Sequence, residues 1–489
     1  MLGQHTVEKI GGTSMSAYQD VRDNILMRPL KGEKVSVDNQ SNLYNRIFVV
    51  SAYGGITDLL LEHKKSGQPG LFQLYSNDSG SAQWREMLDT VREAMFEKNA
   101  ELFQDEVQRE RANDFIGERL SQAESCMVDL RRVCRHGHFA MPDMLVSLRE
   151  MLACIGEAHS AWNMAELLQN EGVNAKFIDL TSWYGDVDQD LDELIRENFD
   201  DLDVSVTLPV VTGYARSKAG LMSHYDRGYS EMTFSRIAVL TAAREAIIHK
   251  EFHLSSADPR LVGVDKAVPI GRTNYDVADH LALLGMEAIH PQAAKGLRKL
   301  GIPLRLRNTF EPEHYGTLID TDYISETPQV EIVAGRSNVK SLEFFNQDIS
   351  GELVEFNEKL VQVLKKHNLE LLTKDYSANA VTLFLDCSNV ELARLSKELE
   401  ASYPQATVTT QSVALVSILG SDMKVPGILS KAVSALANKN ISVLALQQSM
   451  RQVGIQIVVA HDCYNDAVSA LHSELVEVHD HGRAICLAS

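Results

Sequence analysis

Two glycine pairs and several charged side chains are the parts of this sequence whose types and spacing could do chemistry. The first pair lies in the run Lys9-Ile10-Gly11-Gly12-Thr13-Ser14, after a short extended segment, residues 6–9. Successive glycines let consecutive backbone N–H groups point into one concavity that suits phosphate oxygens, and Lys9 adds a point charge. The run also fits a tight turn after an edge strand, and the Walker pattern occurs nowhere in the sequence. Both interpretations stay open for this run alone.

The second glycine pair, Gly54-Gly55, lies in residues 51–58, directly after the apolar run Ile47 to Val50. Ser51 and Thr57 place hydroxyl groups in the same segment. Ligands of open α/β sheets bind at the carboxyl ends of the strands, so this segment is a candidate binding loop. An ordinary strand-to-helix turn, capped by Thr57 or Asp58, explains the same residues.

Charged residues precede or follow three further predicted elements. Arg227-Gly228-Tyr229-Ser230-Glu231 precedes an amphipathic helix, which Ser230 could cap and whose positive end Glu231 complements. Alternatively, Arg227 and the helix N-terminus form an anion site, and Glu231 holds magnesium or orients a carboxylate. Lys250-Glu251 and Arg260, the last in a loop after Asp258-Pro259, complete five polar clusters that follow strands of one predicted sheet. Their convergence favours a ligand site over turn chemistry alone.

Short apolar runs rich in β-branched residues predict the strands that position these clusters. Helical periods lie between several of the runs, which indicates an α/β fold with a mostly parallel sheet covered on both faces. The predicted strands are residues 6–9, 46–51, 174–180, 205–213, 245–252 and 303–308. Residues 81–169 have no strand pattern and predict a helical insert. Within it Cys134, His136 and His138 cluster, but no further ligands have matching spacing, so we predict no metal there.

The pattern changes after Thr317, where a polar connection without apolar period predicts a domain boundary. Two small strand-helix-strand units follow, a weak repeat of pattern only. The first comprises residues 340–347, 352–367 and 381–386, and the second residues 413–420, 426–438, 441–447 and 454–461.

Composition excludes several classes of protein. The 489 residues are 44% hydrophobic, 23% charged and 7% aromatic, which is ordinary for a folded globular protein of several domains. Lys plus Arg number 47 against 67 Asp plus Glu, a net charge of −20, so neither nucleic acid nor a membrane is an expected partner. Six scattered cysteines, no signal-peptide pattern and no long apolar run predict a cytoplasmic protein.

As an ordered set, these motifs resemble those of the aspartate kinase family over nearly the whole chain. The motifs are residues 9–14, residues 51–58, Gly156-Glu157, Arg227-Gly228 with Ser230, Asp258-Pro259-Arg260 and His290-Pro291. Residues 307–310 with Gly316-Thr317 resemble the end of the kinase domain, and residues 421–428 and 440–458 resemble the carboxy-terminal ACT domain. The long helical insert and the variant at residues 225–231 are most similar to aspartate kinases associated with ectoine synthesis.

The resemblance implies an amino-acid-kinase fold over residues 1–318, a linker over 319–330, and two ACT-like α+β units over 331–411 and 412–489. It implies the reaction of ATP with L-aspartate to 4-phospho-L-aspartate and ADP, with magnesium, as the first step of aspartate-family or ectoine biosynthesis. It further implies a homodimer or higher homo-oligomer, joined through ACT sheet edges, with an amino-acid effector.

The resemblance also implies roles for individual residues. Lys9 and Glu231 would be catalytic, because phosphoryl transfer depends mostly on positioning and electrostatics. Ser51, Thr57, Glu157, Arg227 and Ser230 would bind aspartate, with Arg227 on the α-carboxylate and Glu157 on the α-ammonium. ATP would contact Lys9, Gly11, Gly12, Thr13, Lys250, Glu251 and Arg260, and the regulatory ACT residues would be Met423, Val425, Pro426, Gly427 and Ile428.

The sequence departs from the family pattern at three places. Glu231 replaces the usual Asp, Lys250-Glu251 replaces Thr-Asp, and Glu287 replaces Lys. We hypothesise that Lys250 replaces the lysine missing at position 287. The first ACT-like unit, around Gly351, lacks the Met-x-x-x-Pro-Gly pattern of the second. Two rival functions remain open: another amino-acid kinase acting on glutamate or a carbamate-like acid, and a non-catalytic ACT sensor of amino acids.

Overall fold

The computed structural model describes residues 3–28, 43–64, 66–77, 81–135, 140–184, 189–218, 220–225, 228–286, 288–347, 353–367 and 369–477. The chain forms two units, residues 1–253 with 289–321 and residues 254–288 with 322–489, and each is described by itself. The predicted domain limits stay predictions. The structural division differs from them mainly at residues 254–288, which pack with the second unit.

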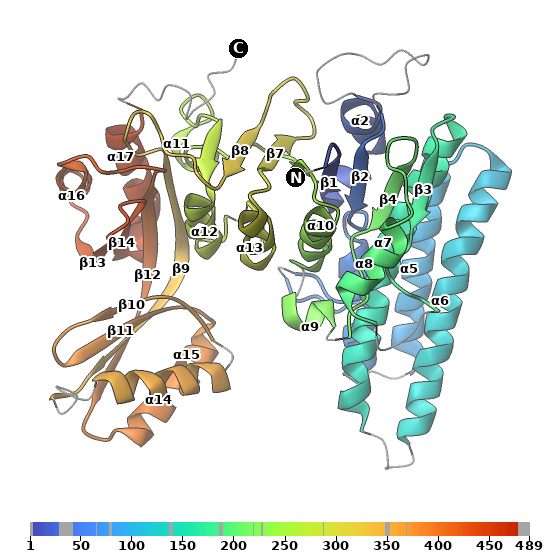
Figure 1. Ribbon diagram of the computed structural model, residues 1–489. Coiled ribbons are helices and arrows are strands. Elements are labelled where there is room, and N and C mark those ends of the chain that lie inside the picture. The colour runs from blue at the N-terminus through green and yellow to red at the C-terminus, as the bar shows by residue number, and fades with distance from the viewer. Residues whose placement is uncertain are drawn as a thin grey trace. The chain divides into compact units, whose positions relative to one another are not determined.

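A mostly parallel sheet forms the centre of the first unit (Figure 1). Its strand order is β3-β4-β2-β1-β5-β7-β8, and only the β7–β8 pair is antiparallel. The strands are β1 (Thr6–Ile10), β2 (Arg46–Val50), β3 (Ala175–Ile178), β4 (Leu208–Thr212), β5 (Glu245–Lys250), β7 (Leu304–Asn308) and β8 (Thr317–Asp320). Every residue of β1, β2 and β4 is buried. The sequences of β2 and β4 are accordingly mostly apolar, whereas β1 carries the charged residues Glu8 and Lys9. The predicted α/β class is confirmed.

Helices connect and cover these strands. The helix α10 (Tyr229–Leu240) packs on β1, β2 and β5, whereas α7 (Met141–Asn170) packs on β2, β3 and β4. The shorter helices are α1 (Gly12–Ser16), α2 (Tyr18–Val21), α3 (Ile56–Leu60), α4 (Leu71–Ser76), α8 (Leu191–Phe199), α9 (Leu221–Tyr225), α10 (Tyr229–Leu240) and α13 (Pro291–Leu300), with a π-helical turn at Arg22–Leu26.

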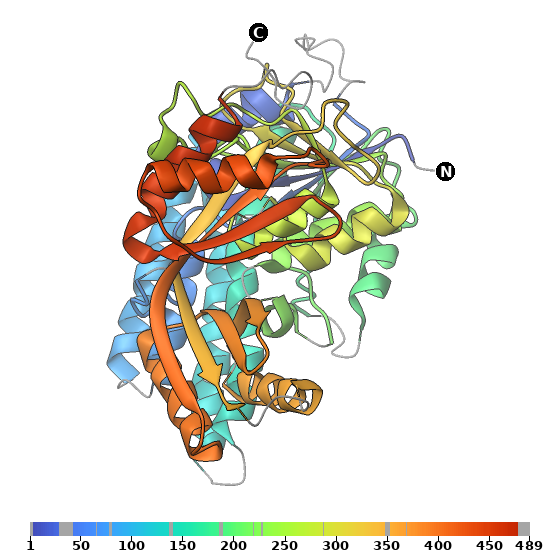
Figure 2. The same cartoon turned by 90° about the vertical axis from the view of Figure 1, so that its left-hand side faces the viewer.

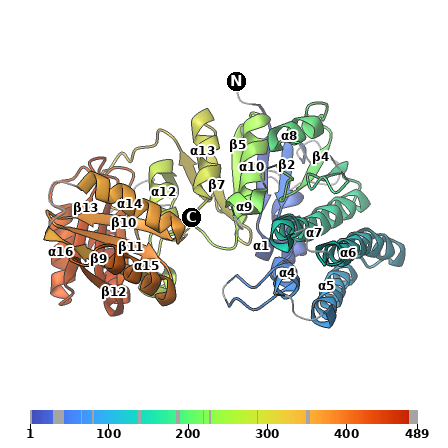
Figure 3. The ribbon, with the colours of Figure 1, turned by 90° about the horizontal axis from the view of Figure 1, so that it is seen from below.

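Three long helices occupy the stretch for which a helical insert was predicted. They are α5 (Ser81–Leu102), α6 (Glu106–Cys134) and α7 (Met141–Asn170), and Figure 3 shows them side by side next to α4. Asp105 caps α6 by accepting a hydrogen bond from the Gln108 N–H, and Pro142 lies in the first turn of α7. Because α7 also packs on the sheet, it links the insert to the strand ends where ligands of such sheets bind.

A buried charged network lies on one face of the sheet. Glu8 is fully buried, and its carboxylate accepts two hydrogen bonds from Arg46, at 2.6 and 2.9 Å, and contacts His249 at 2.7 Å. Burial alone would raise the pKa of Glu8, but the Arg46 and His249 charges hold it well below its usual range. Since side chains alternate along a strand, Glu8 and its neighbour Lys9 point to opposite faces.

We expect Glu8→Gln to lower the free energy of unfolding by about 3–5 kcal/mol, because it leaves the Arg46 charge buried and unpaired. Urea denaturation at pH 7 measures this difference.

Glu8 has a depressed pKa in the folded state, so its contribution to the free energy of unfolding is present above the unfolded pKa and is lost as pH falls through the folded pKa. Wild type should therefore lose its advantage over Glu8→Gln on acidification. An unchanged difference at pH 3.5 would contradict the network's role, and Glu8→Gln with Arg46→Met should recover part of the stability.

The second unit contains a six-stranded antiparallel sheet of order β10-β11-β9-β12-β14-β13. Figure 2 shows its two long central strands, β9 (Ile332–Phe345) and β12 (Thr407–Leu419), running through both halves of the unit. The other elements are α11 (Pro259–Val262), β6 (Arg272–Asn274), α12 (Tyr275–Leu283), α14 (Leu353–Lys366), β10 (Glu370–Tyr376), β11 (Ala380–Asp386), α15 (Asn389–Ser402), α16 (Ile428–Asn438), β13 (Val443–Gln448), β14 (Gly454–Ala460) and α17 (Tyr464–Leu475), with a 3₁₀ turn at His461–Cys463.

Two hydrophobic cores share these long strands. One core packs Leu342 and Phe344 of β9 against α14, α15 and β11. The other packs residues 332–339 of β9 and residues 413–419 of β12 with α12, α16 and α17. Residues 332–339, which the predicted limits placed in the first ACT-like unit, therefore pack in the core of the second half. The strand β10 and the helices α15 and α17 were absent from the predicted repeat.

Candidate active site

A buried lysine lies near the carboxyl end of the central strand. Lys9 is 7% exposed in β1, and its register partners are Val49 in β2 and Ile248 in β5. A buried ammonium group is costly unless a negative group compensates its charge. The strand thus holds a positive charge, with little freedom to move, at the end of the sheet where ligands bind.

The compensating carboxylate comes from the helix α7. Glu157 is 2% exposed, and its Oε2 atom has no hydrogen-bond partner in the described part of the chain. Burial raises the pKa of Glu157 to about 8, although the Lys9 charge and polar groups of Tyr214, Tyr229 and Ala52 act in the opposite direction. A buried carboxylate with an unpaired oxygen beside a buried lysine is a site that a substrate ammonium group could complete.

Gly213 keeps the space around Glu157 open. A Cβ atom at this position would lie 2.7 Å from the Val50 carbonyl oxygen, 2.8 Å from the Ser230 Cβ and 3.0 Å from the Glu157 Oε2. Real Cβ atoms do not approach so closely, so only glycine fits here. The close approach brings the end of β4, the end of β2 and the start of α10 to one point beside the carboxylate.

The predicted hydroxyl residues meet beside this carboxylate. The Ser51 and Ser230 Oγ atoms lie 3.5 Å apart, and the Ser160 hydroxyl donates to the Ser51 carbonyl at 2.9 Å. The helix α10 begins at Tyr229 with Gly228 as its N-cap, so the interpretation of Ser230 as a cap is wrong. Gly55 precedes α3 in the left-handed region, at φ 84°, so capping by Thr57 or Asp58 is wrong as well. Ser230 is therefore free of the capping role that turn chemistry suggested.

A carboxylate supports the first glycine loop from the neighbouring strand end. Glu251 Oε1 accepts hydrogen bonds from the Ser14 N–H at 3.1 Å and the Ser14 hydroxyl at 3.2 Å. On the other side of the loop, a Cβ atom at Gly12 would lie 2.7 Å from the Ala52 carbonyl oxygen. The two glycine-containing loops therefore pack directly on each other, and Glu251 fixes the first loop through its hydrogen bonds to Ser14.

Other predicted residues have different surroundings. Glu231 Oε2 accepts a hydrogen bond from the backbone N–H of His290, at the start of α13. Thr57 lies half-buried in α3, Thr13 is exposed, and Lys250 ends β5 on the same face of the sheet as Lys9.

Arg260 belongs to the second unit, where it is exposed and pairs with Asp258 at 2.6 Å. Arg227, like Glu287, lies outside the described residues.

A polar network in the helical insert supports the second glycine loop. Tyr53, which is buried, contacts the His159 ring edge to face, with centroids 5.4 Å apart. His159 Nε2 lies 2.6 Å from Asn99 Oδ1, and that oxygen also accepts from Asn163 at 2.8 Å. Burial lowers the pKa of His159 to about 3, so its ring is neutral at physiological pH. The network ties α5 and α7 to the loop that carries Ser51.

Sequence reasoning missed several residues of the site. Gly213, Tyr214 and Tyr229 act on Glu157, and Ser14 anchors Glu251. Gly213 is the last residue of the predicted strand 205–213, so its position at the strand end was a usable signal. Nothing in the sequence indicated that the two tyrosines contact a carboxylate from a helix more than fifty residues earlier.

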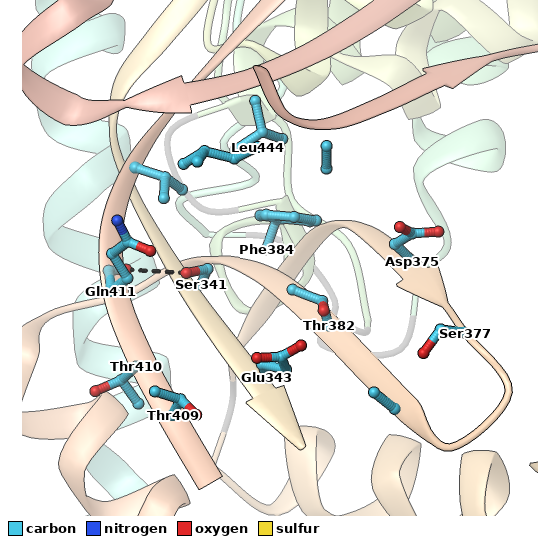
Figure 4. A pocket seen from close by; sticks show the side chains of 14 residues that line it. Ser341, Glu343, Asp375, Ser377, Thr382, Phe384, Thr409, Thr410, Gln411 and Leu444 are labelled. Atoms are coloured by element: carbon cyan, nitrogen blue, oxygen red, sulfur yellow. Dashed lines mark hydrogen bonds between the residues drawn. The ribbon is translucent and has the colours of Figure 1, made fainter. Parts of the chain in front are cut away.

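The predicted regulatory residues lie in a loop and helix start of the second unit. Met423 is buried, Val425 is 38% exposed, and Gly427 caps α16 in the left-handed region at φ 93°. A separate cavity of about 350 Å³ lies on the sheet of this unit, lined by Glu343, Asp375, Phe384 and Leu444 among others (Figure 4). In the same view the Ser341 hydroxyl donates to the Gln411 carbonyl, which joins β9 to β12 at the cavity wall.

The described residues contain neither a metal-binding cluster nor a membrane-spanning helix. No group of three or more His, Cys, Asp or Glu side chains within those residues is arranged to hold a metal ion. Within the same residues, no helix is both long and apolar enough to cross a membrane. His136 and His138, considered above as ligands, lie outside the described residues.

The class of protein follows from this fold and site. Residues 4–308 match the sequence profile of the amino acid kinase family, and residues 416–475 match that of an ACT domain. The chain is 50% identical to aspartate kinase Ask_Ect of Stutzerimonas stutzeri (strain A1501), over 99% of this chain and 100% of that protein. It is 24% identical to the aspartokinase of Candida albicans, over 97% of this chain and 90% of the relative. The chain therefore belongs to the aspartate kinase family.

Solved structures agree on the fold. Escherichia coli aspartokinase III in complex with aspartate and ADP is similar with a TM-score of 0.70 and 20% identity, over 96% of this chain and 100% of that one. The same enzyme with lysine and aspartate gives a TM-score of 0.69 at 19% identity, over 97% of this chain and 100% of the other. The predicted amino-acid-kinase and ACT architecture is thus confirmed.

Proposed function

We propose that this aspartate kinase transfers the γ-phosphoryl group of ATP to the side-chain carboxylate of L-aspartate, and thus acts as a phosphotransferase with a carboxyl acceptor. The observation that carries the proposal is the buried pair of Lys9 and Glu157 at the carboxyl ends of parallel strands. The substrate carboxylate is already ionised at neutral pH, so the enzyme has to bring two anions together. Lys9 supplies the positive charge that this requires, and it needs no strong base beside it.

The geometry supports a role for each side of the site. Glu157 pairs with the α-ammonium group of aspartate through its unpaired oxygen, while Ser51, Thr57 and Ser230 line the pocket. Arg227 is assigned to the α-carboxylate by the family resemblance. The family resemblance assigns the backbone amides of Gly11 and Gly12, with Thr13, to the phosphates. In the structure the Gly11 N–H donates to the His249 carbonyl at 3.4 Å, and Glu251 keeps the loop in place through Ser14. Lys250 and Arg260 are assigned to the nucleotide by the family resemblance. Glu231 positions the reacting groups from the first turn of α10.

Magnesium accompanies ATP in this proposal. The ion usually keeps several waters and binds through one or two carboxylates together with substrate phosphates. The described residues fit that mode because Glu231 presents a carboxylate at the start of α10. Glu231 would hold the ion, which would supply positive charge against the phosphates. The residues of the chain orient the two anions and hold Lys9 where charge develops.

The test is release of ADP from magnesium-ATP with L-aspartate or L-glutamate, with hydroxylamine to trap the acyl phosphate. We expect aspartate-dependent hydroxamate that is absent with Lys9→Ala. Preference for glutamate would favour the rival amino-acid kinase, because one methylene group is worth only about 1–3 kcal/mol. Amino-acid binding without nucleotide binding or turnover would favour the sensor.

Lys250 provides a separate prediction for the nucleotide side. If it replaces the lysine missing at position 287, Lys250→Ala should raise the KM for ATP by about tenfold and leave the KM for aspartate unchanged, since a charge-assisted contact to phosphate is lost. Initial rates at varied ATP measure it. Lys64→Ala, which removes an exposed lysine of the same unit, is the matched control. An unchanged KM for ATP and unchanged turnover in Lys250→Ala would contradict the replacement.

We further propose the protein's biological setting. The identity of 50% with Ask_Ect supports the ectoine-associated subtype, and the ACT match supports an amino-acid effector. Edge strands β10 and β13 support a homodimer or higher homo-oligomer, because unpaired sheet edges commonly pair between chains. A cytoplasmic location suits thiols such as Cys154, which is free. Size-exclusion chromatography with light scattering tests the oligomer, and activity at rising concentrations of lysine, which is bound in one solved relative, tests the effector.

A further inference from the structure

We propose that a second cavity in the first unit binds an organic oxyanion, a carboxylate or phosphate on an apolar body, and that its occupant alters aspartate binding. The cavity has a volume of about 680 Å³ and lies between α6, α7 and the residues that follow β3 and β4. That size falls within the range of small-molecule sites, roughly 300–1,000 Å³. Lys9, Ser51 and Glu157 are absent from its lining, so it is separate from the aspartate site.

The charge of the cavity selects an anion. Arg216 lines it, is half-buried, and has no hydrogen bond or ion pair for its guanidinium group among the described residues. The carboxylate in the lining, Glu150, is already satisfied by the Tyr214 hydroxyl at 2.6 Å, the Met222 N–H at 3.2 Å and the Ser223 N–H at 3.0 Å. A planar guanidinium group binds carboxylate or phosphate with two parallel hydrogen bonds. Arg216 is therefore the anchor for the oxyanion.

The remaining walls suit an apolar body. Met151 and Cys154 of α7 line one side, and Trp183 and Tyr184 line another. Cys154 is almost completely buried, and burial raises the pKa of its thiol, so this wall stays uncharged. Apolar and aromatic walls with a few polar or charged groups, here Arg216, Lys218 and Glu150, are the usual composition of a small-molecule site.

One wall of the cavity reaches the aspartate site directly. Tyr214 lines the cavity and donates its hydroxyl to Glu150, while its backbone lies against Glu157. Its ring also contacts the Tyr229 ring edge to face, with centroids 5.5 Å apart, and Tyr229 in turn interacts with Glu157. A ligand that moves Tyr214 therefore changes the surroundings of the carboxylate that we assign to the substrate ammonium group. This second step rests on the proposed function, whereas the binding step does not.

The test uses the full-length protein and 4-phenylbutyrate as the probe, and isothermal titration calorimetry measures its binding. We expect saturable binding at one site, at least about tenfold weaker binding of the uncharged 4-phenylbutanol, and a similar loss in Arg216→Gln. Phenyl phosphate distinguishes a phosphate preference from a carboxylate preference. Arg132→Gln, which removes an exposed arginine of α6 outside the lining, is the matched control and should bind like wild type.

Kinetics then test the coupling. At saturating 4-phenylbutyrate we expect the KM for aspartate to change by about threefold or more, and Arg216→Gln to lose that change while retaining turnover without the probe. Val146→Trp, which fills the cavity from α7, keeps the test independent of the folding of Arg216→Gln and should block the probe as well. Equal binding of 4-phenylbutyrate and 4-phenylbutanol, or simple competition with aspartate that persists in Arg216→Gln, would overturn the proposal. Loss of turnover in wild type with intact probe binding would contradict the proposed function alone.

Discussion

Lys9→Met should lower kcat about a thousandfold or more while the protein stays folded. The side chain is buried at the end of β1 beside Glu157, and methionine fills nearly the same space without the charge. Charged groups that stabilise a phosphoryl group in flight are worth about 10³–10⁵ in rate, because water is excluded and the group is already in position. The hydroxamate assay measures kcat, and circular dichroism checks the fold.

Lys64→Met is the matched control for that experiment. Lys64 is exposed in the same unit, so its loss should leave kcat within about twofold of wild type. Removing the Lys9 charge also removes a contribution that lowers the pKa of Glu157, so the pH at which aspartate binding sets in should move upward. A Lys9→Met enzyme with near-normal kcat would show that the buried lysine is structural.

Glu157→Gln should lower kcat/KM for aspartate by about a hundredfold or more, mainly through KM. The amide removes the charge that pairs with the substrate ammonium group, and loss of one partner of a buried pair costs about 2–5 kcal/mol. Because the pKa of Glu157 is raised to about 8, wild-type kcat/KM should increase with pH up to about 8 and then level off. The variant should lack that rise. Initial rates at varied aspartate between pH 6.5 and 9 measure both.

The same substitution should increase stability at alkaline pH. The folded pKa of Glu157 lies above its unfolded value, so burying the charged carboxylate costs increasing free energy as pH rises from about 4.5 to about 8. Glu157→Gln should therefore have a higher Tm than wild type at pH 8, and the difference should shrink toward pH 5. Glu97→Gln, an exposed position on α5, should change neither activity nor Tm. A lower Tm for Glu157→Gln than for wild type at pH 8 would show that Glu157 stabilises the fold, and would contradict the cost assigned to burying its charge.

The segment between β5 and α13 shows what a local sequence pattern does not predict, which is the core that buries its apolar side chains. Residues 254–288 follow the strand of Lys250 along the chain, so chain order predicted that they belong to the first domain. In the structure their apolar side chains, including Val277 and Leu281, are buried in the core of the second unit. Burial partners depend on which surfaces meet in three dimensions, and periodicity along one segment carries no information about them.

By itself, the sequence determined most strands of the first unit and their order along the chain. Runs rich in apolar residues marked β2, β4, β5 and β7, and a short extended segment before the first glycine pair marked β1. Strands that are buried on both faces, such as β2 and β4, are mostly apolar. The glycine pairs and the acidic and basic residues at the ends of these runs were also readable, since parallel strands bring their carboxyl ends to one edge. That was enough to place Lys9, Ser51 and Ser230 near one another.

Only the tertiary structure decided what those residues contact. Glu157 lies in the site because its long helix, α7, packs on three strands. The pKa of Glu157 is raised because this packing buries its carboxyl group. Gly213 and Tyr214 became recognisable once β4 met α7 and α10 at distances that exclude a Cβ atom. Glu251, predicted to bind nucleotide, is seen to hold the glycine loop through Ser14. Electrostatics and close packing act between residues distant in sequence, so the fold has to be known before their effects can be assigned.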